Sequence, residues 1–306
     1  MATNRIFYAC QAVGFGASGG SALTGVQSVG CNSTFGLEQV FQLGQIEIYE
    51  NIEGTPEVEL TIEKVFDGKT NLYGAYAGTG KSITQVATLR NTVTLAVVTD
   101  SESVHEGSAG TIGVECTGVY MSNYSANFSV DGTSTDTITV VGNHQNWGAK
   151  TLSIAKAEGT ADVAKRQDLS LSVGGVAGPV AQTSKVQSAS ASIDFGREDL
   201  LEFGSKTPYF RAASFPVECS AEVTFNAVAA NLVSNLNFID PQTSDVQTAD
   251  STVTISYVAG GTGVGNTGNI GISGRCTGMN YSGGDATGGN ATITYSYTGY
   301  NNFTYE

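Results

Sequence analysis

The chain is poor in positive charge. Of its 306 residues, 14 are Lys or Arg and 28 are Asp or Glu, so the formal net charge is −14. A protein that binds the nucleic-acid backbone by displacing counterions needs clustered Lys and Arg. The composition therefore argues against that mode of binding. It fits simple solubility, or a surface that must stay near DNA without adhering to it.

Long apolar runs and metal-ligand spacings are also missing. No run of 18 apolar residues occurs, so we expect no transmembrane helix and no membrane partner. The opening segment MATNRIFYACQAVGF lacks the apolar core of a secretion signal. His105 and His144 are the only histidines and stand in no metal-binding spacing, so we predict no metal and no cofactor.

The sequence holds few cysteines, and none of them are closely spaced. Five cysteines form no CxxC pair, and an odd number leaves at least one without a partner. Buried, reduced thiols are expected in preference to a disulfide framework or a zinc site. The five are Cys10, Cys31, Cys116, Cys219 and Cys276.

The chain is rich in glycine and contains segments in which apolar and polar residues alternate. It holds 39 Gly and 5 Pro, which favours strands and glycine turns over helices. QIEIYENI (45–52) and EVELTIEKV (57–65) alternate on either side of EGTP (53–56), which predicts a β-hairpin. In the second strand Val58, Leu60 and Ile62 should point inward. Further strands are predicted at 92–98, 110–120, 124–130 and 135–141.

Helix signals are few. GLEQVFQLG (36–44) could form a turn or short helix that ends at Gly44. SITQVATLR (82–90) places apolar residues at helical spacing after Ser82, a good N-cap. A further short helix is expected within the segment 144–166.

One stretch resembles a phosphate-binding loop. GAYAGTGKSITQ (74–85) fits a permissive P-loop pattern, and Asp100 follows an apolar run downstream. A real P-loop joins a strand to a helix in a parallel sheet with crossover helices, and this sequence lacks those helices. The pattern predicts a helix start and not a nucleotide site, so we expect no enzyme activity.

The chain repeats itself at an offset of 160 residues. VQSVGCNSTFGLEQVFQLG (26–44) aligns with VQSASASIDFGREDLLEFG (186–204), and TVTLAVV (92–98) with TVTISYV (252–258). The tripeptide CTG recurs at 116–118 and 276–278. NYS and TIT recur with a small shift, NYS at 123–125 and 280–282 and TIT at 137–139 and 292–294. A single offset over nearly a hundred residues predicts two copies of one domain, 1–143 and 167–306, joined by 144–166.

The segment VQSVGCNSTFGLEQVFQLGQIEIYENIEGTPEVELTIEKVFDG (26–68) resembles the tail tube proteins of tailed bacteriophages. The resemblance implies a mostly β fold, in which each copy is an antiparallel β-sandwich with a short flanking helix. It implies rings of six such domains, stacked into a tube that guides DNA. The corresponding part of the second copy departs from the pattern, because it has lost most of the acids.

Several expectations follow from this resemblance. The chain would bind itself, in trimeric rings rather than hexameric ones. It would also contact terminator, baseplate or tip proteins, and a sheath if the tail is contractile. DNA would pass without specific binding. The protein would be made in the host cytoplasm and end in the virion tail. At least two of the four acids of the hairpin are expected to line the channel, and the candidates are Glu47, Glu57, Glu59 and Glu63.

Other function classes stay open at this point. A two-domain β adhesin or a fibre subunit that binds glycans would share the composition, and the aromatic segment YTGYNNFTY (297–305) would suit it. A P-loop nucleotide hydrolase is the remaining alternative.

Overall fold

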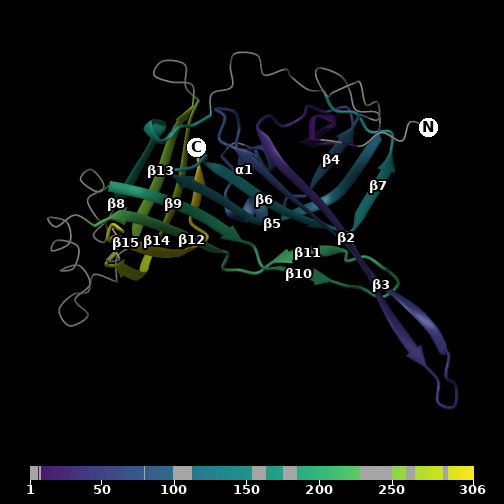
Figure 1. Ribbon diagram of the computed structural model, residues 1–306. Coiled ribbons are helices and arrows are strands. Elements are labelled where there is room, and N and C mark those ends of the chain that lie inside the picture. Colours follow the sequence, from purple (N-terminus) through teal and green to yellow (C-terminus); the bar gives the residue numbers. More distant parts are fainter. Residues whose placement is uncertain are drawn as a thin grey trace.

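Strands dominate the fold (Figure 1). The computed structural model describes residue 6 and residues 8–78, 80–98, 112–153, 163–174, 185–227, 250–259, 266–284 and 289–306. All strand pairings between named strands in these ranges are antiparallel, and the two α-helices are short. The prediction of a mostly β, antiparallel protein is confirmed.

The first half of the chain forms two groups of strands that share β5. In the first group, the pairing order is β2–β3–β6–β5. In the second group, β4 pairs with both β1 and β5, and β7 pairs with β5. The strands are β1 (Gln11–Phe15), β2 (Val26–Phe41), β3 (Ile48–Val65), β4 (Asn91–Val97), β5 (Ile112–Ser129), β6 (Thr135–Gly142) and β7 (His144–Gly148).

The second half of the chain is arranged around β14. The pairing order is β9–β12–β15–β14–β13–β8, and β16 also pairs with β14. A separate hairpin, β10–β11, follows β9. The strands are β8 (Leu169–Gly174), β9 (Lys185–Asp194), β10 (Arg197–Leu200), β11 (Phe210–Ala213), β12 (Glu218–Asn226), β13 (Ser251–Ala259), β14 (Asn266–Ser282), β15 (Thr292–Tyr300) and β16 (Phe303–Tyr305).

The two halves join through one strand pair. β5 pairs with β9 from Asn123↔Asp194 to Ser129↔Ser188, so a single sheet runs without interruption from β2 to β14. Buried side chains of both halves form one hydrophobic cluster. At its centre, the Tyr73 ring lies 5.5 Å from the Tyr124 ring and 4.9 Å from that of Phe303. This packing ties the C-terminal strand to the first half.

A charged cluster lies inside this core. The Lys64 ammonium is buried and donates hydrogen bonds to Asp67 and to the carbonyl of Val65. Asp136 lies opposite Lys64 on the neighbouring strand and accepts a 2.6 Å hydrogen bond from the N–H of Leu72. Burial raises the pKa of Asp136 to about 7, despite that hydrogen bond and the nearby Lys64 charge.

The region from 36 to 57 differs from the sequence prediction. The expected helix at 36–44 is wrong, because β2 continues to Phe41 and pairs with β3 throughout. The expected turn at 53–56 is also wrong. β3 continues through residues 53–56 and forms a β-bulge there. Phe35 pairs with Pro56 and Leu37 with Glu53, so two residues of β3 lie opposite the single residue Gly36 of β2. The chain reverses at 42–47 instead.

Glycine makes this bulge possible. A Cβ on Gly54 would lie 3.3 Å from the Cα of Gly36, so a side chain at position 54 would crowd the facing backbone. Beyond the bulge, β3 pairs with β2 alone, since its pairing with β6 starts at Val58. Residues 35–56 therefore form a two-stranded projection, which we call the first arm (Figure 1).

The other local predictions have mixed outcomes. Val58, Leu60 and Ile62 are buried, as predicted. A helix starts after Ser82, as predicted, although α2 (Ile83–Ala87) ends earlier than expected, and the Ser82 N–H donates to the Gln85 side chain. The strands expected at 110–120 and 124–130 are one strand, β5, with an irregularity between Met121 and Asn123.

Parts of the remaining predictions fall on residues outside the described ranges. These include His105, Asp100 and much of the expected helix in 144–166, where the described portion holds the 3₁₀ turn η2 (Arg166–Asp168). No disulfide joins the five cysteines. Three of them are buried, but Cys31 is exposed on β2. The expectation that all five are buried is wrong because Cys31 lies on the edge strand of the sheet.

Candidate channel-lining surface

The long sheet has one apolar face and one polar face. The face with Leu60 and Ile62 packs into the core. On β3, the opposite face carries Glu57, Glu59, Thr61 and Glu63, and the pairing register extends this face across the other strands. It includes Thr137 and Thr139 of β6, Asn123 and Ser125 of β5, Ser190 and Ser192 of β9, Ser220 and Glu222 of β12, Ser296 and Thr298 of β15, and Asn280 and Ser282 of β14. We call these residues, with the acids of β3, the polar face.

Short hydroxyl side chains link the strands of the polar face. The Ser192 and Ser220 hydroxyls lie 2.7 Å apart, and those of Thr224 and Thr294 lie 3.0 Å apart. Each such pair satisfies two polar groups without a long side chain. The polar face therefore consists mainly of short hydroxyl and amide side chains, with the acids of β3 and β12 and with the exposed Arg275 of β14, which lies opposite Thr298.

Three of the four acids singled out in the sequence come together on this face. Glu57 and Glu59 are exposed, and Glu63 is partly buried and accepts a 3.2 Å hydrogen bond from the Ser28 hydroxyl. Glu57 also lies 3.4 Å from Arg211 of β11, which offsets part of its charge. Glu47 is separate from these three, because it lies in the turn at the tip of the first arm.

The second half also places acids on the polar face, which were not predicted from the sequence. Glu218 and Glu222 stand exposed on β12, where they point to the polar face, and Asp194 lies opposite Glu218 on β9. The signal was present in the sequence, because ECSAEVTFN alternates in the same way as EVELTIEKV. The second half has fewer acids than the first, but it does not lack them at this position.

The hairpin β10–β11, which we call the second arm (residues 197–213), lies against the first half of the chain. The Arg197 guanidinium donates to the carbonyls of Met121 and Ala87, and lies 5.1 Å from the centre of the Tyr120 ring. Arg90 donates a 3.0 Å hydrogen bond to the carbonyl of Tyr209. Desolvation lowers the pKa of Arg197 to about 10, so the group is still a cation at neutral pH.

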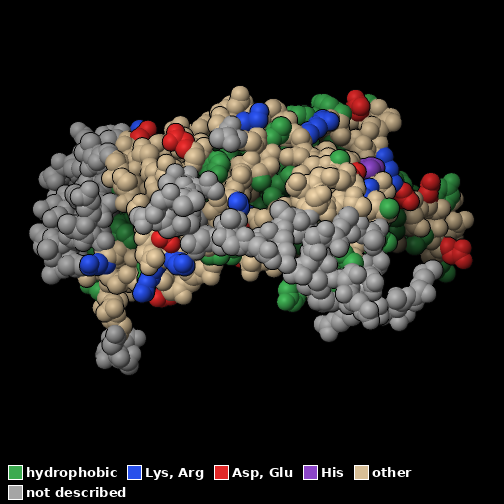
Figure 2. Space-filling model, turned by 90° about the horizontal axis from the view of Figure 1, so that it is seen from above, with side chains coloured by type: hydrophobic (Ala, Val, Ile, Leu, Met, Phe, Trp, Pro, Cys, Tyr) green, Lys and Arg blue, Asp and Glu red, His purple; other side chains and the backbone are tan. Residues whose placement is uncertain are grey.

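The tip of the second arm reaches the first arm. Lys206 forms an ion pair with Glu53, and this contact lowers the pKa of the Glu53 carboxyl. The first arm itself exposes a row of large apolar side chains. They are Phe35, Leu37, Phe41, Leu43, Ile46, Ile48, Tyr49 and Ile52. Figure 2 shows hydrophobic and acidic side chains together at the end of the molecule that this arm forms.

The P-loop resemblance has no structural basis. The segment that should form the loop begins inside α1 (Leu72–Ala77) and continues into the link to α2. Asn71 caps α1, and its side chain accepts a 2.7 Å hydrogen bond from the Gly74 N–H. No strand precedes α1 directly, since β3 ends at Val65. Lys81 is exposed in the link between α1 and α2.

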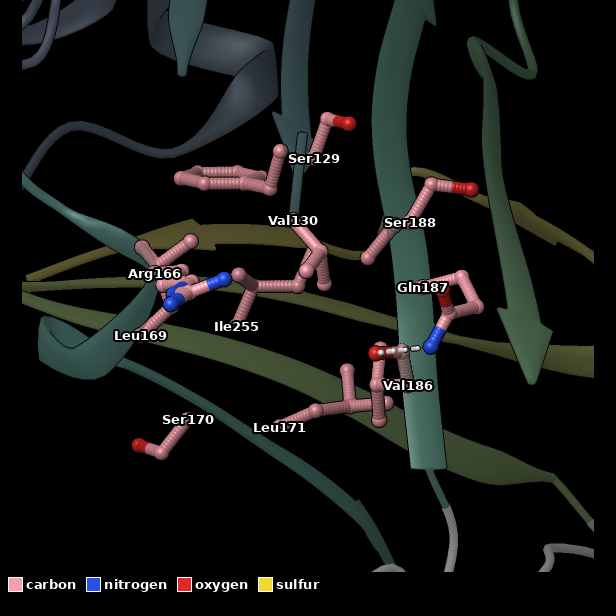
Figure 3. Close-up of a pocket in the computed structure, with 12 residues that line it drawn as sticks. Ser129, Val130, Arg166, Leu169, Ser170, Leu171, Val186, Gln187, Ser188 and Ile255 are labelled. Carbon is pink, nitrogen blue, oxygen red and sulfur yellow. Dashed lines mark hydrogen bonds between the residues drawn. The ribbon is translucent and has the colours of Figure 1, made fainter. Parts of the chain in front are cut away.

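A small pocket lies where the two halves meet (Figure 3). Its volume is about 140 Å³, below the roughly 300 Å³ of a typical small-molecule site. Val186, Leu171 and Ile255 line it together with the end of β5. Within the described ranges, no group of three or more potential metal ligands is present. We assign no binding role to the pocket.

Comparison with known proteins assigns the first half of the chain to a family. A family model described as Phi812 tail tube protein matches residues 12–142. Residues 12–142 are a phage tail tube domain. No curated protein matches the chain. The matched region holds β1 to β6, and so includes the first arm and the acids of β3.

The resemblance noted in the sequence is thereby confirmed. The chain is a structural component of the phage tail, and tail tube proteins assemble with copies of themselves. The tail tube family is structural and not enzymatic. Within the described ranges, no helix is long and apolar enough to cross a membrane.

Proposed function

We propose that three copies of this chain form one ring of the tail tube, with six tube domains around a channel through which DNA passes. Each chain supplies two domains, residues 1–143 and 167–306, connected by residues 144–166. Stacked rings form the conduit. In this arrangement the chain contacts sheath, terminator, and baseplate or tip proteins only at the outside and ends of the tube.

The observation that carries this proposal is the equal pairing pattern of the two halves. β2–β3–β6–β5 in the first half corresponds to β9–β12–β15–β14 in the second. β4 and β1 correspond to β13 and β8, and β7 corresponds to β16. The repeated sequence positions fall on corresponding strands, with Val26 and Val186 on β2 and β9, and Cys116 and Cys276 on β5 and β14.

The polar face supports a channel-lining role. A wall that lets DNA slide must not hold its phosphates, and DNA carries about one negative charge per 1.7 Å of its axis. Acids and short hydroxyls meet that requirement, because neither group forms ion pairs with phosphate. We propose that Glu57, Glu59 and Glu63 line the channel together with Glu218 and Glu222. Glu47 stays a prediction, and its place at the arm tip sets it apart.

Electron microscopy of the purified chain tests the proposal. Negatively stained particles should be rings or tubes, and averaged end views should show a central channel surrounded by six similar densities. Mass measurement of isolated rings should give three chains. Compact single chains at all concentrations would contradict the assembly, and six chains in a ring would contradict the role of the second half as a tube domain.

A further inference from the structure

Two cysteine thiols from different strand groups meet in the first half of the chain. Cys31 lies on β2, and Cys116 lies on the part of β5 that pairs with β4 and β7. The two side chains form a hydrogen bond with each other. Cys31 is exposed, whereas Cys116 is buried. The contact therefore joins a thiol that small molecules in solution can reach to one that they cannot.

The strands around the two thiols hold them in this contact. Cys31 lies opposite the core residue Leu60 of β3, so its side chain is on the face of β2 that points away from the polar face. Cys116 lies opposite Gln145 of β7. The hydroxyl of Ser33, two residues from Cys31 on the same face, donates a 2.7 Å hydrogen bond to the side-chain oxygen of Gln145. Two adjacent side-chain contacts thus connect β2 to β5 and β7.

The surroundings make Cys31 the more reactive of the two thiols. The hydrogen bond from the Cys116 thiol lowers the pKa of Cys31 to about 7, against the effect of partial burial, and the Ser33 hydroxyl acts in the same direction. The hydrogen bond to Cys31 and burial raise the pKa of Cys116. The thiolate is the nucleophile in thiol–disulfide exchange. At neutral pH, Cys31 is therefore the thiol that attacks first.

The second half of the chain has no equivalent pair. At the offset of 160 residues, Cys116 aligns with Cys276, but Cys31 aligns with Ala191. Ala191 is buried on β9. The Cys276 thiol donates a 3.5 Å hydrogen bond to the carbonyl of Gly278. Cys276 is thus a cysteine at the same repeat position without a second cysteine at the position aligned with Cys31, which makes it a matched control.

We propose that Cys31 and Cys116 form a redox-sensitive site, which a small-molecule disulfide converts into a disulfide bond within the chain. The Cys31 thiolate attacks one sulfur of the small disulfide, whose S–S bond breaks, and one small thiolate leaves. The Cys116 sulfur then attacks the Cys31 sulfur, and the second small thiolate leaves. The two protons lost by the protein balance those on the two small thiols formed. The protein dithiol is oxidised by two electrons, and the small disulfide is reduced.

The bond gives the edge strand a second attachment. Among the described residues β2 pairs only with β3, and the first arm extends from these two strands. A disulfide between positions 31 and 116 closes a long loop of the chain, and long loops are those whose closure restricts the unfolded state most. Oxidation therefore fixes the base of the first arm to β5 and raises thermal stability. All of these contacts lie within one chain, so the inference does not depend on the proposed ring.

Oxidised glutathione is the probe for this site. After incubation of the reduced full chain with it at neutral pH, peptide mapping should find the 31–116 bond in most molecules. The Tm should lie at least about 5 °C above that of the dithiothreitol-reduced protein. Cys276→Ala, which removes the thiol at the equivalent repeat position, should form the same bond and show the same rise in Tm.

Two variants of Cys116 separate the contact from the exchange reaction. Cys116→Ala and Cys116→Ser should both keep glutathione on Cys31 as a stable mixed disulfide, because neither side chain can displace it. Alkylation of Cys31 by iodoacetamide should have its pH midpoint near 7 in the unaltered chain. The midpoint should stay there in Cys116→Ser, whose hydroxyl can still donate a hydrogen bond. It should rise by about one pH unit in Cys116→Ala.

Three results would overturn the proposal. A stable mixed disulfide on Cys31 of the unaltered chain, without a 31–116 bond, would show that the two thiols do not act together. An alkylation midpoint that is the same in Cys116→Ala and in the unaltered chain would give the same answer. A 31–116 bond that leaves the Tm unchanged would contradict the second attachment of β2.

Discussion

At the scale of single residues, the buried cluster around Lys64 is the main electrostatic feature of the core. A buried ammonium requires compensation, and Asp67 supplies it directly, with Thr24 donating a 2.7 Å hydrogen bond to the other oxygen of that carboxylate. Asp136 is the less compensated acid. Buried charges of this kind make stability depend on pH.

We predict that Asp136 makes the fold more stable as the pH falls from 7 toward 4. Its pKa is about 7 in the folded state and about 4 when unfolded, so the folded state binds the proton more tightly. This contribution is complete below pH 4 and is lost as the pH rises through 7. Its upper limit is on the order of 4 kcal/mol, in a cluster that also holds Lys64, Asp67, Tyr124 and Tyr257.

Urea unfolding at pH 5 and pH 7.5 measures this dependence. Asp136→Asn should reduce the difference in unfolding free energy between pH 5 and pH 7.5, because the titrating carboxyl is gone. The variant keeps the local structure, since the amide oxygen can still accept a hydrogen bond from the Leu72 N–H. Asp131→Asn is the control, because Asp131 is exposed at a turn. An unchanged pH difference in Asp136→Asn would contradict the assignment.

Lys81 should be dispensable. It lies exposed between two short helices, so Lys81→Ala should change stability by less than about 0.5 kcal/mol and leave assembly unaltered. A phosphate-release assay with ATP should find the same background rate for both proteins. Hydrolysis that disappears in Lys81→Ala would show that the loop has a catalytic role after all.

At the scale of elements, Arg197 fixes the second arm. Arg197→Ala removes the donor to the carbonyls of Met121 and Ala87, and it removes the packing on Tyr120. We expect a loss on the order of 2 kcal/mol in unfolding free energy, and faster hydrogen exchange in residues 197–213. Lys206→Ala, at the exposed tip of the same arm, should change neither measurement. Equal effects of both variants would contradict the anchoring role.

The arms also show where reading the sequence succeeds and fails. The burial of Val58, Leu60 and Ile62 follows from two-residue alternation, and the start of α2 follows from Ser82, because both signals are local. The helix expected at 36–44 failed because strand pairing with 48–55 overrides weak helix propensity. EGTP has turn chemistry, but the same residues suit a bulge, and only the partner strand distinguishes the two.

The polar face was harder to predict from the sequence. Its first-half acids could be found, since each alternates with a buried residue. Its extension over β9 and β12 depends on the β5–β9 pairing, which joins residues that are 59 (Ser129↔Ser188) to 71 (Asn123↔Asp194) positions apart in the sequence. No local sequence pattern encodes that pairing, so the sequence could not show that Glu218 and Glu222 lie on the same face of the sheet as Glu59.

At the scale of the whole molecule, reversing charge on the polar face should create DNA binding. Assembled tubes of Glu59→Lys with Glu222→Lys should retain DNA at low salt and release it as salt rises, because phosphate contacts are screened. Glu202→Lys with Glu306→Lys makes the same change in net charge outside the polar face and should not retain DNA. Filter binding of labelled double-stranded DNA at two salt concentrations distinguishes tubes of the two double variants. Equal retention by both variants would argue against a channel position for Glu59 and Glu222.

The β5–β9 pairing has a consequence for how the tube is made. Because this joint lies within one polypeptide, its two partners meet at an effective concentration set by the linking residues and not by the amount of protein in the cell. Only the joints between chains respond to dilution. In the proposed ring of six domains, three molecules would need to meet in place of six, so the yield of rings would depend on a lower power of protein concentration. Under the same proposal, disassembly would stop at single chains of two joined domains, each of which keeps the β5–β9 contact.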